Sequence, residues 1–88
     1  MKTFKDINWK AHGIKGAIQG LLMLENGIEL SVVAGPGLYS LPREAGKSPD
    51  DFSKFEVAVI DKDGKFIGDP RGWQTREKVE GLIKEFNK

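Results

Sequence analysis

Few residues of this sequence could do catalytic chemistry. The 88 residues include a single histidine, His12, and no cysteine, so the chain has one candidate general base and neither a thiol nucleophile nor a thiolate metal ligand. His12 lies in a glycine-flanked segment with no nucleophile pattern beside it, and we expect it on the surface ahead of the first strand. The carboxylates show no spacing that would bring two of them to one concave face. We therefore expect a protein that is not an enzyme and needs no cofactor.

Two short sequence patterns resemble known ligand-binding motifs. Asp61, Asp63 and Asp69 could be read as a calcium loop. An EF-hand loop needs Gly at its sixth position and Glu at its twelfth, whereas Gly64 is fourth here, so we expect a tight hairpin turn and no metal. The segment 35–37, Gly-Pro-Gly, could be read as a phosphate cradle. It lacks the strand and helix context of a P-loop, and its proline has no backbone donor for an anion.

Binding chemistry concentrates in a nineteen-residue connection, residues 35–53. Typical connections run about 4 to 6 residues, so we expect a long exposed loop that contacts a partner. Tyrosine and arginine are over-represented at binding hot spots because they combine a large contact area with directed hydrogen bonds. The expected partner-binding residues are Leu38, Tyr39 and Arg43 in this loop and Trp73 near the start of the last helix.

A β-hairpin must precede this loop. Apolar residues recur with period 2 over residues 14–24 and 28–34, with the even-numbered side chains on one face. Asn26-Gly27 between the two runs predicts a two-residue type I′ turn, because both residues tolerate the positive φ angles that this turn requires.

Three further elements complete the expected fold. Residues 55–60 are rich in β-formers and predict a third strand, and residues 65–67 predict a short fourth one. The C-terminal segment changes to a helical period, with apolar residues at i, i+3, i+4 and i+7 and Thr75 as N-cap. Ser48-Pro49-Asp50-Asp51-Phe52 predicts a single helical turn inside the loop.

These elements predict one small α+β domain over residues 1–88. We expect a three- to four-stranded, mainly antiparallel sheet with the C-terminal helix packed on one face. Residues 1–12 are expected to form a solvated basic arm. The stretch at 21–24 is the longest apolar run, far below the roughly 20 residues that a membrane span needs, and no signal peptide is apparent, so we expect a cytosolic protein without a membrane partner.

The uncovered face of the sheet is a second candidate surface. Depending on the pairing register, it would carry Leu21, Met23, Val33, Ala58 and Ile60. An apolar patch of this kind needs a partner or a second copy, so we expect a homodimer.

Positive charge gathers at the front of the chain. Residues 1–24 carry four lysines against one acid, whereas residues 25–74 hold nine acids against six bases. A nucleic-acid binder of this size usually shows a denser basic stripe, so we do not expect nucleic acid as the partner. A weak nucleic-acid-binding function stays open as an alternative, with Lys2, Lys5, Lys10 and an interleaved Trp9 as its residues.

Five short stretches lie in order along the chain. They are Leu30–Val33, Pro42-Arg43, Ser48–Phe52, Phe55–Val59 and Gly72–Thr75. In this combination the chain resembles a family of small uncharacterised proteins encoded by bacteriophages and prophages, over about residues 10–86. No catalytic motif comes with the resemblance. What it implies is a setting, namely an accessory phage protein that acts inside a bacterial cell.

The leading hypothesis follows from this setting. We expect a non-enzymatic phage protein that binds and inhibits or redirects a host factor, such as a protein of a defence system, in the host cytoplasm. An alternative is an oligomer that sequesters a small nucleotide signal, with Lys15 and Arg43 as cations beside glycine-rich backbone.

Overall fold

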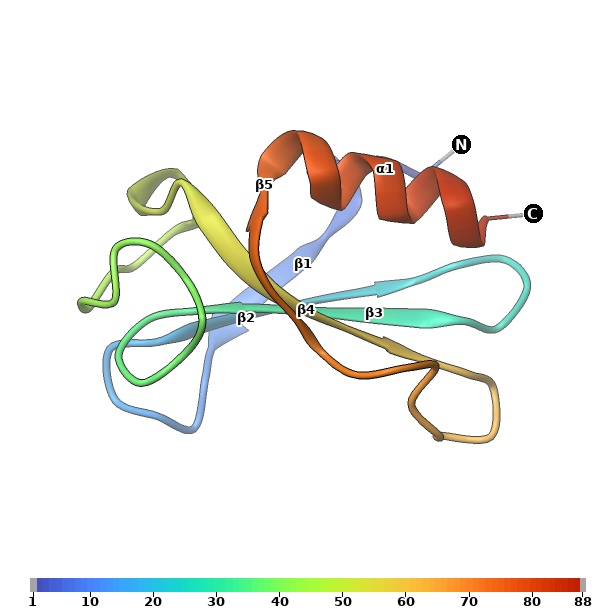
Figure 1. Cartoon of the computed structure of the whole chain (residues 1–88), viewed down its shortest axis with the longest axis horizontal. Coiled ribbons are helices and arrows are strands. Elements are labelled where there is room, and N and C mark those ends of the chain that lie inside the picture. The colour runs from blue at the N-terminus through green and yellow to red at the C-terminus, as the bar shows by residue number, and fades with distance from the viewer. Residues whose placement is uncertain (1, 88) are drawn as a thin grey trace.

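Five antiparallel strands form one sheet in the computed structural model of the chain, which describes residues 2–87 (Figure 1). The strands are β1 (Asn8–Ala11), β2 (Ile18–Met23), β3 (Glu29–Ala34), β4 (Lys54–Ile60) and β5 (Arg71–Thr75), and they lie side by side in chain order. Two short 3-10 helices, η1 (Phe4–Asp6) and η2 (Pro49–Asp51), and the C-terminal helix α1 (Arg76–Phe86) complete the chain. The predicted α+β class is confirmed, but the sheet has more strands than predicted.

The first extra strand is β1, and the prediction of a solvated arm over residues 1–12 is wrong. Asn8 pairs with Leu21 and Ala11 with Ile18, which places β1 at the sheet edge. Phe4 and Ile7 are buried ahead of it, and the Phe4 backbone N–H donates to a carboxylate oxygen of Glu80 in α1. Apolar side chains therefore tie this basic segment to the core.

The second extra strand is β5. It follows residues 65–67, which the sequence predicts to form the fourth strand. Of the strand predicted over residues 65–67, only an isolated bridge between Phe66 and Ile60 forms. The turn before it is confirmed, since a carboxylate oxygen of Asp61 accepts hydrogen bonds from the N–H groups of Asp63 and Lys65. The chain then returns along β4 as β5.

The hairpin between β2 and β3 is confirmed, but its turn differs from the predicted one. Met23 pairs with Glu29, and the Leu24 N–H donates to the Ile28 carbonyl, so the loop has three residues, 25–27. Gly27 has a φ of 88°, while Asn26 keeps a negative φ, as in a type I turn followed by a glycine bulge. The Asn26 amide instead donates to the carbonyl of Phe86, at the end of α1. Strand β2 also begins at Ile18, four residues later than the apolar period predicts.

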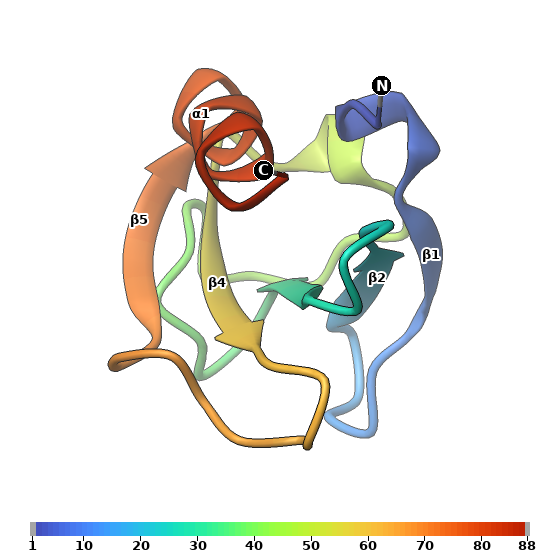
Figure 2. The same ribbon diagram turned by 90° about the vertical axis from the view of Figure 1, so that its right-hand side faces the viewer.

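The hydrophobic core lies on one face of the sheet, under α1 and η1 (Figure 2). Even-numbered residues of β2 and β3 point into it, as predicted, and so do Phe55, Val57 and Val59 of β4. Four aromatic rings meet at its centre, with the Phe55 ring 5.6 Å from Phe4 and 5.8 Å from Trp9, and Phe52 beside it. Helix α1 buries its predicted apolar stripe here, and its N-cap is Thr75, whose hydroxyl accepts from the Lys78 N–H.

Gly81, on the outer side of α1, lowers the stability of the helix because glycine loses more backbone entropy on folding than other residues do. This glycine is exposed, and a Cβ added to it would meet no atom within 4 Å. Gly81→Ala is expected to raise the free energy of unfolding by about 1 kcal/mol, because alanine loses less backbone entropy in a helix. Urea unfolding measures the change, and an unchanged or lowered midpoint would contradict it.

Candidate functional site

Two exposed aromatic rings are stacked on each other at one edge of the sheet. The ring centroids of Tyr39 and Trp73 are 4.9 Å apart, and the ring planes are inclined by 27°. The residues remain 52% and 45% exposed, so stacking leaves much of both rings available for contact. The guanidinium carbon of Arg43 lies 5.9 Å from the Tyr39 ring centroid. Three of the four predicted partner-binding residues, here called the aromatic cluster (Tyr39, Arg43 and Trp73), are thus brought together.

Main-chain hydrogen bonds on both sides hold Tyr39 in this position. Its N–H donates to a Glu56 carboxylate oxygen at 3.0 Å, and its carbonyl accepts from the Trp73 N–H at 2.9 Å. The loop therefore lies against β4 and β5. Gly72 makes the approach possible, since a Cβ there would lie 2.7 Å from the Cβ of Tyr39. Neither Glu56 nor Gly72 was singled out by the sequence, because no local pattern shows which loop residue they meet.

The backbone of Trp73 is strained. Its φ is 53°, a left-handed conformation that side-chain-bearing residues rarely adopt, and it is the one non-glycine residue with positive φ in the described chain. Such a conformation costs about 1 to 3 kcal/mol and persists only where neighbouring contacts enforce it. It coincides with the register shift between Phe55 and Val57 in the pairing of β4 with β5. The fold thus holds the Trp73 side chain outward, although the backbone conformation that this requires is locally unfavourable.

The remainder of the loop is anchored to the domain rather than free. Leu41 pairs with Lys54, and Ser40 is fully buried, with its hydroxyl accepting from the Gly35 N–H at 3.0 Å. The predicted helical turn is confirmed as η2, where a carboxylate oxygen of Asp51 accepts from the N–H groups of Lys47 and Ser48. These two hydrogen bonds lower the pKa of Asp51, because they favour the ionised form. The aromatic cluster therefore rests on an ordered support.

Charge near the cluster is available for a partner. Within residues 2–87, Arg43 makes no ion pair, whereas Arg76 pairs with Asp50 at 3.0 Å. The Gly46 N–H donates to the Gly16 carbonyl, so the loops that carry Arg43 and Lys15 touch. An exposed guanidinium beside an aromatic stack can bind a carboxylate in two-pronged fashion or stack on another ring.

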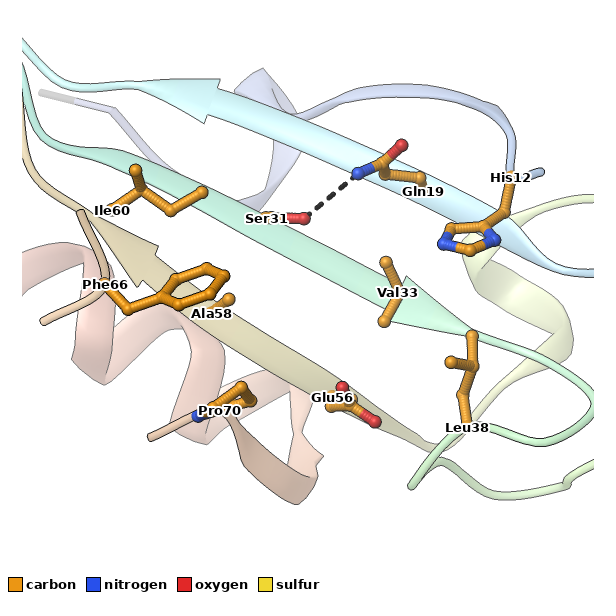
Figure 3. Close-up of a pocket in the computed structure, with 10 residues that line it drawn as sticks. All are labelled: His12, Gln19, Ser31, Val33, Leu38, Glu56, Ala58, Ile60, Phe66 and Pro70. Carbon is orange, nitrogen blue, oxygen red and sulfur yellow. Dashed lines mark hydrogen bonds between the residues drawn. The ribbon is translucent and has the colours of Figure 1, made fainter. Parts of the chain in front are cut away.

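Leu38 lies apart from the cluster. It is half-buried and lines a groove of about 340 Å³ on the sheet face opposite α1 (Figure 3). The groove floor consists of side chains from the three central strands, which are Gln19, Ser31, Val33, Glu56, Ala58 and Ile60. Its walls come from the loops, through His12, Leu38, Phe66 and Pro70. His12 follows β1 rather than preceding the first strand, and its Nδ1 accepts from the Ile14 N–H.

Trp9 does not point outward with the N-terminal lysines. Its half-buried ring packs against Phe4 and Phe55, with centroid distances of 5.8 Å to each. Lys10, the next residue, points to the opposite face of the sheet. The aromatic ring that the nucleic-acid alternative needs for base stacking is therefore committed to the core.

Metal and membrane features were also sought in the described part of the chain. No group of three or more His, Asp or Glu side chains among residues 2–87 is placed to hold a metal ion. No helix there is both long and apolar enough to cross a membrane. A scan against models of protein families, a search of curated proteins and a search of solved structures each found no match to this chain.

Proposed function

We propose that this chain is a non-enzymatic binding protein that captures a protein of a bacterial host through the aromatic cluster. The setting comes from the sequence resemblance to phage and prophage proteins. In that setting, capture in the host cytoplasm would inhibit or redirect the bound factor, for example a component of a defence system. The non-enzymatic part of the proposal rests on the sequence, with its single histidine and lack of cysteine.

One observation carries the proposal, namely the stacked and exposed pair of Tyr39 and Trp73 beside Arg43. Tryptophan, tyrosine and arginine are the residue types that contribute most to binding at protein interfaces. A side chain that is ordered before binding loses little conformational entropy on association, which raises affinity. The hydrogen bonds of Tyr39 and the strained Trp73 backbone provide such order here.

The geometry also limits what the partner surface must offer. The exposed cluster presents flat aromatic area with a cation next to it. A complementary surface has an apolar pocket or a further ring for the aromatic residues, and a carboxylate for Arg43. We therefore expect an acidic, partly apolar epitope on a folded host protein.

The proposal predicts the result of combined alanine substitution. Tyr39→Ala with Arg43→Ala is expected to weaken binding to the captured protein at least about 30-fold, because two residues that each contribute more than about 1 kcal/mol together contribute more than about 2 kcal/mol. Stability should change little, since the hydrogen bonds that hold Tyr39 use its main chain. The measurement is affinity capture from a bacterial host lysate, followed by titration with the purified partner and by thermal unfolding of both forms.

A matched control carries Ile14→Ala with Lys62→Ala. These residues are likewise exposed and combine an apolar and a cationic side chain, but they lie in other loops. The control should bind as the wild type does. If the Tyr39 and Arg43 variant also binds unchanged, the cluster is not the binding surface. A small added mass on a defined oligomer in native mass spectrometry, without a captured protein, would favour the nucleotide-sequestering alternative instead.

A further inference from the structure

The sheet face opposite α1 carries apolar and polar side chains next to each other. The five apolar residues expected on this face are present, but each of them pairs with a polar residue of a neighbouring strand. The pairs are Met23 and Ile60 with Glu29, Leu21 and Ala58 with Ser31, and Val33 with Gln19 and Glu56. Directly paired residues project their side chains to the same face of an antiparallel sheet. A molecule that binds here must therefore offer both apolar and polar groups.

The depth of the groove on this face comes from two small side chains. Ser31 and Ala58 pair directly across β3 and β4 and form the middle of the groove floor. Larger side chains surround them, with Glu56 on the β4 side and Phe66 on the loop that follows β4 (Figure 3). The groove volume of about 340 Å³ lies within the range typical of pockets that bind small molecules.

Phe66 gives the groove an aromatic wall. An isolated bridge to Ile60 holds this residue beside the end of β4, yet its side chain is 63% exposed. An exposed ring can stack on another flat group or contact a cation. The space over Ala58 next to this ring therefore suits a planar group.

Glu56 is the only Asp, Glu, Lys or Arg residue that lines the groove. One of its carboxylate oxygens accepts from the Tyr39 N–H at 3.0 Å, and within residues 2–87 it makes no ion pair. His12, on another wall, is uncharged in this arrangement, because its Nδ1 accepts a hydrogen bond from the Ile14 N–H and so carries no proton. The groove therefore favours a ligand with a positive charge.

The strand geometry relates this charge to the aromatic wall. Glu56 and Ala58 are successive residues of one face of β4, so they lie about 7 Å apart along the strand. A ring over Ala58 and against Phe66 would bring a cationic group attached to it toward Glu56. The glutamate side chain is long enough to close the remaining distance.

We propose that the groove binds a small organic cation with a planar apolar body, such as an aromatic amidine, with its charge on Glu56 and its ring against Phe66. An amidinium can donate two hydrogen bonds to a carboxylate, and contact with the floor buries apolar area. The inference goes beyond the proposed capture of a host protein and does not depend on it. Tyr39 contributes only its main-chain N–H, and neither Arg43 nor Trp73 lines the groove.

NMR titration of the isotope-labelled protein with benzamidinium tests the proposal. The amide signals of Ser31, Val33 and Ala58 are expected to shift with a dissociation constant of about 1 mM or lower, which is near the limit for so small a ligand. Benzamide has the same shape without the charge and should bind at least about tenfold more weakly, because a hydrogen bond to a charged partner is the stronger one. Benzoate, with the opposite charge, should not bind.

Four variants locate the site. Glu56→Gln keeps an acceptor for the Tyr39 N–H and should raise the dissociation constant of benzamidinium at least about tenfold. Phe66→Ala removes the aromatic wall without touching that hydrogen bond and should raise it at least about threefold. Glu85→Gln, exposed on α1 on the other side of the sheet, is the matched charge control and should bind as the wild type does. Tyr39→Ala with Arg43→Ala should also leave this binding unchanged, which separates the groove from the aromatic cluster.

Three results would overturn the proposal. The first is the absence of shifts in the groove signals at about 10 mM benzamidinium, tenfold above the expected dissociation constant. The second is binding that benzoate matches, or that neither Glu56→Gln nor Phe66→Ala weakens. The third is a shift of the same signals with protein concentration alone, because a second copy of the chain would then occupy the groove.

Discussion

Phe55→Ala is expected to lower the free energy of unfolding by about 3 to 5 kcal/mol, which is the typical cost of removing a fully buried phenylalanine ring. Phe55 is 0% exposed and lies among the rings of Phe4, Trp9 and Phe52. These neighbours come from η1, from β1 and from the long loop, so they cannot all move to fill the cavity. A domain of this length has about 4 to 13 kcal/mol of stability in total, so the variant is expected to lose a large part of it.

Urea unfolding followed by tryptophan fluorescence measures this loss, since the Trp9 ring lies 5.8 Å from Phe55. Phe55→Leu keeps most of the apolar volume and should cost less than half as much. Phe66→Ala removes the same side chain from a 63% exposed position and should change the stability of the monomeric protein by less than about 0.5 kcal/mol. A Phe55→Ala loss as small as that of Phe66→Ala would show that the ring cluster is not the centre of the core.

Gly20→Ala is expected to cost about 1 to 3 kcal/mol, through overpacking rather than through a cavity. Gly20 pairs with Trp9 across β1 and β2 and faces the core. A Cβ there would collide with Cγ2 of Ile7 and come within 2.9 Å of two atoms of the Trp9 ring. A glycine inside a strand often marks such a close approach. The added methyl group must therefore displace Trp9 or Ile7 from the aromatic centre of the core.

A double-mutant cycle separates this collision from a general effect of alanine. Ile7→Ala removes the colliding Cγ2 atom, so Gly20→Ala should cost less in that background than in the wild type. Gly81→Ala, at a glycine with open space around it, should change stability in the opposite direction. Strictly additive losses for Gly20→Ala and Ile7→Ala would show that the two side chains do not compete for the same space.

Local pattern was enough to predict the inner part of this fold. The strands around residues 18–34 and 54–60 and the helix near the C-terminus were predicted in place, and so were their buried faces. In each of them, burial follows a period of 2 or 3.6 that neighbouring residues carry. The turn at residues 25–27 is of another type than predicted, since the loop has three residues and only Gly27 has a positive φ. The Asn26 side chain also donates to Phe86, a residue 60 positions away that no local pattern identifies.

The edge strands and the candidate site could not be predicted from local pattern, because they depend on contacts between distant segments. Strand β1 has one inward apolar ring, Trp9, which gains a place in the core only through its pairing with β2. The types of Tyr39, Arg43 and Trp73 indicated binding, but Glu56 and Gly72, which hold Tyr39 beside Trp73, carry no local signal. Leu38 is adjacent to Tyr39 in the chain, but its side chain lines the groove on the sheet face opposite α1. A tight turn at Tyr39, in which the Ser40 N–H donates to the Leu38 carbonyl, separates the two side chains.

The sequence by itself determined the α+β class, the hairpin, strand β4 and the apolar stripe of α1, because each depends on residues close together in the chain. Tertiary structure decided that the basic N-terminal segment forms an edge strand, that the long loop is anchored and that three of the residues predicted to bind a partner form one cluster. These features depend on strand register and on single hydrogen bonds between distant segments, which leave no period in the amino-acid sequence.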